Sequence, residues 1–394
     1  MKDDEKEIEQ LDEKNKSCIK KIKKLIVFVF IFLIVLFFGI SWGYEQYKIF
    51  QFKKKYENLN HGEILKVGNM HNRKASANLH LMNNGNVLIS GGLNDKNIEY
   101  FEIFDINKGI FKKIKLPACF RNPRHSILLS ENKVLINDSF IYDFLTQKYI
   151  NIFKRQDYTQ NSKSFKFSNE EILIIEQNKV YIYNINDDSL KNYPFSLPNI
   201  SVKNFIKMDD NHILIYGDKS LSSGENIFWN TEFFLLNLQN NHLEKIKIDS
   251  IGTDVSVVKI SNDEIILFAN IIEDNNSIPF KTQVTYKVNV KNNNIIKLNS
   301  PLVKRKFAPV AILLTNNTIL LFGGDVDSSK GYIVAEIYDP EKNEYYVFSK
   351  IKFMFTPQYE KNPAVVELLN GDIFICGGMY ESFLLDKCVV MRKE

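Results

Sequence analysis

The apolar residues of this chain follow two different patterns. Residues 25–44 begin with the unbroken run LIVFVFIFLIVLFFGI and stay free of charge as far as Tyr44. About 20 helical residues cross a hydrocarbon core of about 30 Å, so this run predicts one transmembrane helix, with Trp42 and Tyr44 as interfacial anchors. Beyond residue 60, short apolar runs alternate with clusters of Asn, Asp, Ser and Gly, which predicts short β-strands joined by turns.

A cleaved signal peptide is the alternative to an uncleaved signal-anchor. The region before the span is long, the apolar run exceeds a usual h-region and no A-x-A-like site follows, so we expect the anchor. Six lysines lie in residues 14–24 and four in residues 48–55, which places the N-terminus inside. The expected segments are a cytoplasmic tail over 1–24, a transmembrane helix over 25–44, a stalk over 45–60 and an extracytoplasmic domain over 61–394.

A repeat organises the rest of the chain. Arg73 to Gly91 has the order strand, Asn-Asn-Gly turn, strand and glycine pair, and Arg305 to Gly323 has the same order with identical spacing. The corresponding positions after each second strand are Gly91, Asp138, Glu176, Gly217, Ala269, Gly323 and Gly377. Their average step of about 48 residues predicts an array of seven similar units.

The glycine pairs, the E-x-Y-D-P string at Glu336 to Pro340 and the Arg that opens the unit resemble kelch repeats. The resemblance covers residues 61–394; it is specific in units one, six and seven and degraded in units two to five. It implies an all-β fold, a seven-bladed kelch-type β-propeller of the galactose oxidase-like superfamily, preceded by one transmembrane helix.

The last unit lacks a fourth strand. Only 16 residues follow Gly378, and they have room for a third strand, KCVVMRK. Residues 62–68 (GEILKVG) read as an orphan strand placed just before unit one. We expect this strand to pair with the last blade and close the ring, because closure removes the edge that an open sheet exposes.

Charge and cysteine content limit the function classes. The net charge is +4 and no Arg-rich stretch occurs, so the sequence gives no nucleic-acid footprint. None of the four cysteines forms a CxxC pair, which argues against a zinc ribbon. Cys376 and Cys388 would be neighbours on adjacent strands and able to form a disulfide in an oxidising compartment, but the sequence alone favours two small buried thiols.

Catalytic precedents on this fold need residues that the sequence does not assemble. The copper radical oxidases of the galactose oxidase class use two His, two Tyr and a Tyr–Cys crosslink, whereas His80, His212 and His242 fall at different levels of their blades, so no metal or cofactor site is expected. The enzymatic alternative is a sialic-acid mutarotase-like enzyme, whose acid and base residues could be present here without forming a recognisable sequence motif. Nothing in this sequence selects such catalytic residues.

The arginines give the binding hypothesis its residues. In kelch propellers that capture acidic peptides, the Arg ahead of the innermost strand reaches the mouth of the central channel. By that resemblance Arg73, Arg305 and Arg124 (or its neighbour Arg121) line one face and bind carboxylates bidentately. The competing interpretation is structural, with arginines that join blades through backbone carbonyls. We expect a non-catalytic module for a protein or carbohydrate ligand, held at the membrane through residues 25–44.

Overall fold

The computed structural model describes most of the chain. The described residues are 2–92, 100–117, 120, 125–152, 163–168, 170–176, 179–196, 198, 200–223, 226–248, 251–273, 280–305, 308–324, 332–352, 363–380 and 383–393. They form two compact units, Met1–Asn58 and Leu59–Glu394.

The first unit is a single helix, α1 (Lys2–Glu57). Its apolar stretch is long and apolar enough to span a membrane, and the large apolar side chains from Ile26 to Phe38 are 40–71% exposed. The helix extends beyond the apolar run on both sides, through the residues expected as tail and stalk. Those flanks contain many Lys, Glu and Gln residues and no Pro, a composition that favours helix.

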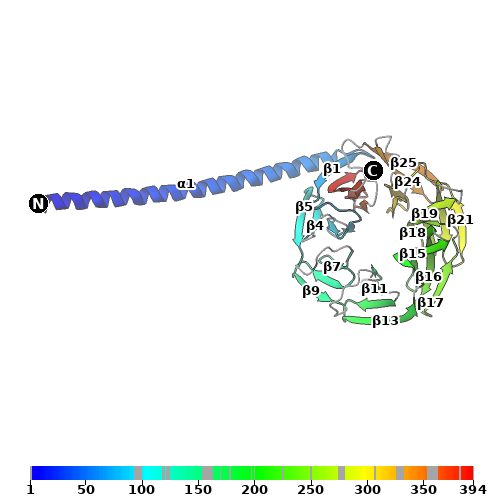
Figure 1. Ribbon diagram of the computed structural model, residues 1–394. Coiled ribbons are helices and arrows are strands. Elements are labelled where there is room, and N and C mark those ends of the chain that lie inside the picture. The colour runs from blue at the N-terminus through cyan, green and yellow to red at the C-terminus, as the bar shows by residue number, and fades with distance from the viewer. Residues whose placement is uncertain are drawn as a thin grey trace. The chain divides into compact units, whose positions relative to one another are not determined.

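The second unit is a ring of seven blades, each a four-stranded antiparallel sheet (Figure 1). Blade 1 has β2 (Asn78–Leu81), β3 (Val87–Ser90), β4 (Tyr100–Asp105) and β5 (Ile110–Lys115); blade 2 has β6 (Ser126–Leu128), β7 (Lys133–Ile136), β8 (Phe140–Asp143) and β9 (Lys148–Asn151); blade 3 has β10 (Lys163–Lys166), β11 (Glu171–Glu176), β12 (Lys179–Asn184) and β13 (Ser189–Ser196).

The remaining blades repeat this order. Blade 4 has β14 (Ser201–Lys207), β15 (His212–Ser223), β16 (Asn226–Asn237) and β17 (His242–Ile246); blade 5 has β18 (Ile251–Lys259), β19 (Glu264–Glu273), β20 (Phe280–Asn289) and β21 (Asn294–Leu298); blade 6 has β22 (Val310–Leu313), β23 (Ile319–Phe322), β24 (Tyr332–Asp339) and β25 (Glu344–Lys352); blade 7 has β26 (Ala364–Glu367), β27 (Ile373–Cys376), β30 (Lys387–Met391) and β1 (Ile64–Asn69). A small hairpin, β28 (Met379–Tyr380) and β29 (Phe383–Leu384), completes the described strands.

The second strand of a blade is apolar on both faces because both faces meet a neighbouring blade. All four residues are buried in β3, in β23 and in β27. Apolar clusters accordingly span adjacent blades: one joins blades 4 and 5, and another joins blades 6 and 7. The core is therefore a series of sheet-to-sheet interfaces around the ring, as in other face-packed sheets.

The fourth strands lie at the rim of the ring (Figure 1). In blades 1–5 each carries an exposed lysine, namely Lys112, Lys148, Lys191, Lys245 and Lys297. A charged side chain on an edge strand opposes pairing with another chain.

Blade 7 contains both ends of the propeller. β1 pairs antiparallel with β30, with Ile64 opposite Met391, and β30 pairs with β27. Cys376 and Cys388 lie directly opposite each other with Cα atoms 4.2 Å apart, and a disulfide joins them. The prediction of two free thiols is therefore wrong, because β27 and β30 pair in a register that places Cys388 opposite Cys376.

Candidate functional site

Each second strand ends on the same face of the ring, which we call the strand-end face. In blades 1, 6 and 7 a glycine pair with positive φ follows the strand, at Gly91–Gly92, Gly323–Gly324 and Gly377–Gly378. A Cβ at Gly92 would lie 2.8 Å from the Ala75 carbonyl oxygen, and one at Gly377 would lie 2.3 Å from the Lys74 carbonyl oxygen. The glycines thus allow the chain that enters blade 1 to pass close to both strands.

In blade 6 this face contains a closed ion pair. The Arg305 and Glu336 side chains are both 0% exposed and form a salt bridge. Arg305 Nε donates to the Gly323 carbonyl oxygen at 3.0 Å, and Nη2 donates to the Val334 carbonyl oxygen at 3.3 Å. Burial lowers the pKa of the Arg305 guanidinium, and Glu336 opposes that shift. Arg305 therefore joins backbone carbonyls, and no part of its side chain is exposed to a ligand.

Blade 1 has the corresponding carboxylate, Glu102. It lies opposite Ile89 in the sheet, as Glu336 lies opposite Leu321. Glu102 Oε2 accepts a hydrogen bond from the His71 backbone N–H at 2.9 Å and lies 2.8 Å from His71 Nδ1. Glu336 Oε1 likewise accepts one from the Val303 backbone N–H at 3.1 Å. The two blades thus hold a buried glutamate in the same way.

The cation beside Glu102 is a lysine. Lys74 is 0% exposed, and its Nζ lies 4.0 Å from Glu102 Oε1, too far for a hydrogen bond. Among the residues that the structure describes, neither Lys74 Nζ nor Glu102 Oε1 has a hydrogen-bond partner. Burial lowers the pKa of Lys74 to about 8, an effect that the charge of Glu102 opposes. A buried ammonium with no acceptor is costly, so this pair contrasts with the satisfied pair of blade 6.

Arg73, the predicted equivalent of Arg305, is exposed. The Lys74 backbone N–H donates to the Leu385 carbonyl oxygen at 2.8 Å, and the Lys74 carbonyl oxygen accepts from the Gly378 N–H at 2.8 Å. These bonds to blade 7 hold the backbone of Lys74 so that its side chain enters blade 1. The repeat spacing had indicated the preceding residue, Arg73, for this place. Arg124 and its alternative Arg121 lie outside the described residues.

A second polar group links blades 1 and 2 near the ring axis. Ser126 Oγ lies 2.5 Å from Ser90 Oγ and 3.3 Å from His80 Nε2. Burial is the main cause that lowers the pKa of His80 to about 4, so its imidazole is neutral near pH 7. The buried hydroxyls satisfy each other across the interface, which identifies them as connectors between blades.

The same line of contacts continues into blade 3. Asp138, in the left-handed region at φ 59°, has its Oδ1 2.9 Å from His125 Nδ1 and accepts a hydrogen bond from Ser164 Oγ. A serine nucleophile requires a hydrogen bond from the serine to the histidine. Here Ser164 and His125 each contact the Asp138 carboxylate instead, so the three residues do not have the arrangement of a catalytic triad. Within the described residues, no group of three or more His, Cys, Asp or Glu is placed to hold a metal ion.

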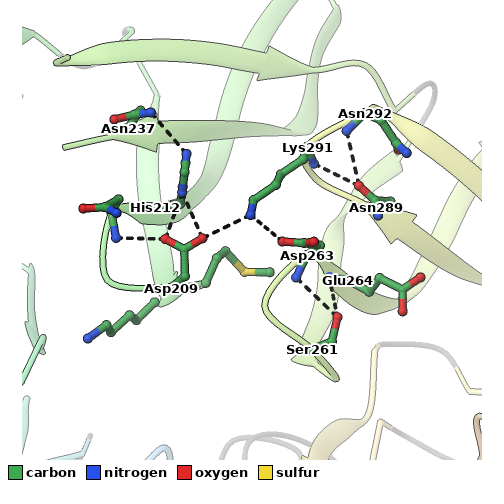
Figure 2. A network of polar contacts seen from close by, with 12 residues as sticks. Asp209, His212, Asn237, Ser261, Asp263, Glu264, Asn289, Lys291 and Asn292 are labelled. Atoms are coloured by element: carbon green, nitrogen blue, oxygen red, sulfur yellow. Dashed lines mark hydrogen bonds and ion pairs between the residues drawn. The ribbon is translucent and has the colours of Figure 1, made fainter. Parts of the chain in front are cut away.

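A third network lies on the opposite face, between blades 4 and 5 (Figure 2). Lys291 Nζ lies 3.3 Å from Asp209 Oδ2 in blade 4 and 2.7 Å from Asp263 Oδ1 in blade 5. His212 Nδ1 lies 2.8 Å from Asp209 Oδ1. Burial alone would raise the pKa of Asp209, but hydrogen bonds from Asn211, His212 and Lys291 lower it to about 2. This network fastens two turns of neighbouring blades, and all its charges are paired.

Comparison with known proteins shows the fold. No protein-family model and no curated protein sequence matches the chain. Among solved structures, it is similar to the extracellular domain of a B. thetaiotaomicron protein described as a hybrid two-component system, with a TM-score of 0.53 and 10% identity over 82% of this chain. A second structure of the extracellular domain of the same B. thetaiotaomicron protein, there described as a one-component system, gives a TM-score of 0.54 and 10% identity over 84% of this chain.

The chain spans about two fifths of those domains, 39% and 40% of their lengths. At this level of identity the similarity supports a common propeller architecture and carries no residue-level correspondence.

Changing Arg305 to Ala should lower the free energy of unfolding by about 3–5 kcal/mol, because it leaves Glu336 charged and buried without its partner. The matched variant Arg73→Ala removes an exposed arginine of the same face and should change stability by less than about 0.5 kcal/mol. Urea unfolding followed by circular dichroism measures both. Equal losses for the two variants would contradict the assignment of Arg305 as the buried member.

The network at Asp209 should make stability depend on pH. The folded-state pKa of Asp209, about 2, lies below that of an unfolded aspartate. The stability that ionised Asp209 contributes is therefore present above about pH 4 and is lost as the pH falls towards 2. Asp209→Asn should lower the thermal midpoint near neutral pH and make its fall on acidification shallower. The control is Asp210→Asn, since the Asp210 side chain is 93% exposed. Parallel acid curves for wild type and Asp209→Asn would refute this role.

Proposed function

We propose that the chain is a membrane-anchored, kelch-type propeller that recognises an extracytoplasmic ligand on its strand-end face without catalysing a reaction. The repeat spacing, the glycine pairs and the E-x-Y-D-P string support the kelch assignment. The observation that carries the binding role is the junction of blades 7 and 1, where exposed Arg73 and half-exposed His71 adjoin the unpaired Lys74 and Glu102 atoms.

Three observations support a propeller outside the cytoplasm. Lysines are more numerous before the apolar run than after it, which favours a cytoplasmic N-terminus. Cys376 and Cys388 form a disulfide, and disulfides persist in oxidising compartments. The similar propeller of B. thetaiotaomicron is part of an extracellular domain.

The proposed topology predicts the redox state of the two cysteines in cells. If membranes are isolated in the presence of a thiol-alkylating reagent, peptide mass spectrometry should recover Cys376 and Cys388 as a linked pair. Protease added to cells whose outer barrier has been removed should digest the propeller and spare the tail before residue 25. Alkylated Cys376 and Cys388, together with a protected propeller, would place this domain in the cytoplasm and refute the proposal.

Ligand capture tests the recognition face. The full-length protein in detergent should retain a component of its native envelope, and Arg73→Ala should reduce that retention, because the change removes a bidentate donor from the strand-end face. Lys108→Ala is the matched control: it removes an exposed cation from the β4–β5 turn of the same blade, on the opposite face. Equal retention by wild type and Arg73→Ala would exclude Arg73 from the recognition surface.

A further inference from the structure

The Lys74–Glu102 pair contains two complementary atoms that the described protein leaves unused. Lys74 Nζ is a donor and Glu102 Oε1 is an acceptor; both are buried, both lack a hydrogen-bond partner, and they lie 4.0 Å apart. Buried polar groups in native proteins almost always find a partner, and the exceptions call for an explanation. A group placed between these atoms must accept a hydrogen bond from one and donate one to the other.

Blade 6 shows how the same position is closed. There each nitrogen of the Arg305 guanidinium has a partner, among them Glu336 and two backbone carbonyls, and both side chains are 0% exposed. In blade 1 the Lys74 ammonium group forms no hydrogen bond with the glutamate or with a backbone carbonyl of the described residues. The two blades therefore differ in the cation beside the buried glutamate, which is an arginine with several acceptors in blade 6 and, one position later in the repeat, a lysine without an acceptor in blade 1.

The charges at the site restrict the chemistry of that group. Glu102 disfavours an anion next to Lys74, and Lys74 disfavours a cation next to Glu102, because both charges are buried where screening is weak. A hydroxyl group is uncharged and is both a donor and an acceptor. A molecule with adjacent hydroxyls satisfies Lys74 and Glu102 together, and each such bond to a charged group is among the stronger hydrogen bonds.

Of the residues that contact this pair, His71 is partly exposed. Its side chain is 38% exposed, its Nδ1 contacts Glu102 Oε2, and its ring meets the edge of Tyr100 at a centroid distance of 6.1 Å. A rotation of the imidazole would break its contact with Oε2, whereas the bond from the His71 backbone N–H to Oε2 does not depend on the ring. The Tyr100 ring packs against the His71 imidazole, and its hydroxyl donates to Asn72 Oδ1 at 3.1 Å.

We propose that Lys74 and Glu102, covered by His71, bind a small neutral polyhydroxylated molecule at the junction of blades 7 and 1. This inference rests on the proposed binding function and names the ligand class for the same face. Lys74 donates to a ligand hydroxyl, Glu102 accepts from it or from its neighbour, and the imidazole of His71 moves aside.

Saturation-transfer NMR on the full-length protein in detergent micelles tests this site. The probes are glucose, galactose, mannose and glycerol as neutral polyols, and glucuronate and acetate as anions. Wild type and Lys108→Ala should give transfer to at least one neutral polyol. Lys74→Arg should weaken that binding about tenfold or more, because the guanidinium closes the pair as in blade 6 and a charge-assisted hydrogen bond is lost.

Folding controls keep the outcome interpretable. Lys74→Arg should have a thermal midpoint no lower than that of wild type, since it reproduces the satisfied arrangement of Arg305. Glu102→Gln is the second variant; it preserves shape, removes the charged acceptor and should weaken polyol binding by a similar factor. Equal transfer in wild type and Lys74→Arg, no transfer from any neutral polyol, or binding of the anions alone would each overturn the proposal.

The two levels of the hypothesis fail separately. If the envelope component is still captured through Arg73 while no neutral polyol binds, the recognition function stands and the ligand class is wrong. If polyols bind in a manner that depends on Lys74 while Arg73→Ala changes nothing, the site stands and recognition does not use Arg73.

Discussion

Pairing between β1 and β30 is the contact on which the rest of the propeller depends. Without β1, blade 7 would have three strands and β30 would be its unpaired outer edge. Blade 7 is completed by strands from both ends of the domain, and the Cys376–Cys388 disulfide joins β27 to β30. Phe104 of blade 1 then stacks on Phe374 of blade 7 at a centroid distance of 4.6 Å and seals the last interface.

Closure also determines which cation enters blade 1. The chain leaves β1 at the rim of blade 7 and must reach β2 near the axis, and Leu385 and Gly378 hold the backbone of Lys74 on the way. The glycines at positions 92 and 377 leave room for this passage, since a Cβ at either would collide with a carbonyl oxygen. The side chain at position 74, and not that of Arg73, therefore points at Glu102.

Much of this architecture could be predicted from the sequence. A strand packed on both faces needs a short, wholly apolar run, and the number of residues from one such run to the next gives the length of one blade. The strand near residues 62–68 followed from counting, since the last unit lacks a fourth strand, and the structure places β1 beside β30. The repeat spacing predicted that Arg73 would occupy the position of Arg305. Lys74 occupies it because its backbone is bonded to Leu385, which lies far away in sequence and which the repeat does not reveal. The disulfide depended on the register between β27 and β30, which spacing alone does not fix.

Polar groups at the other blade junctions show why the blade 7–1 junction is distinctive. Asp138 is held by His125 and Ser164, and Lys291 lies within 3.3 Å of two aspartates, so these charged groups join blades through close contacts with opposite charges or hydrogen-bond donors. Lys74 and Glu102 are equally buried, yet each keeps an unused atom. Stability alone favours the arginine solution already present in blade 6, because it satisfies every buried group. In the proposed function, a ligand completes the pair that Lys74 leaves open, and a departure from local consistency is where function is expected in an otherwise regular fold.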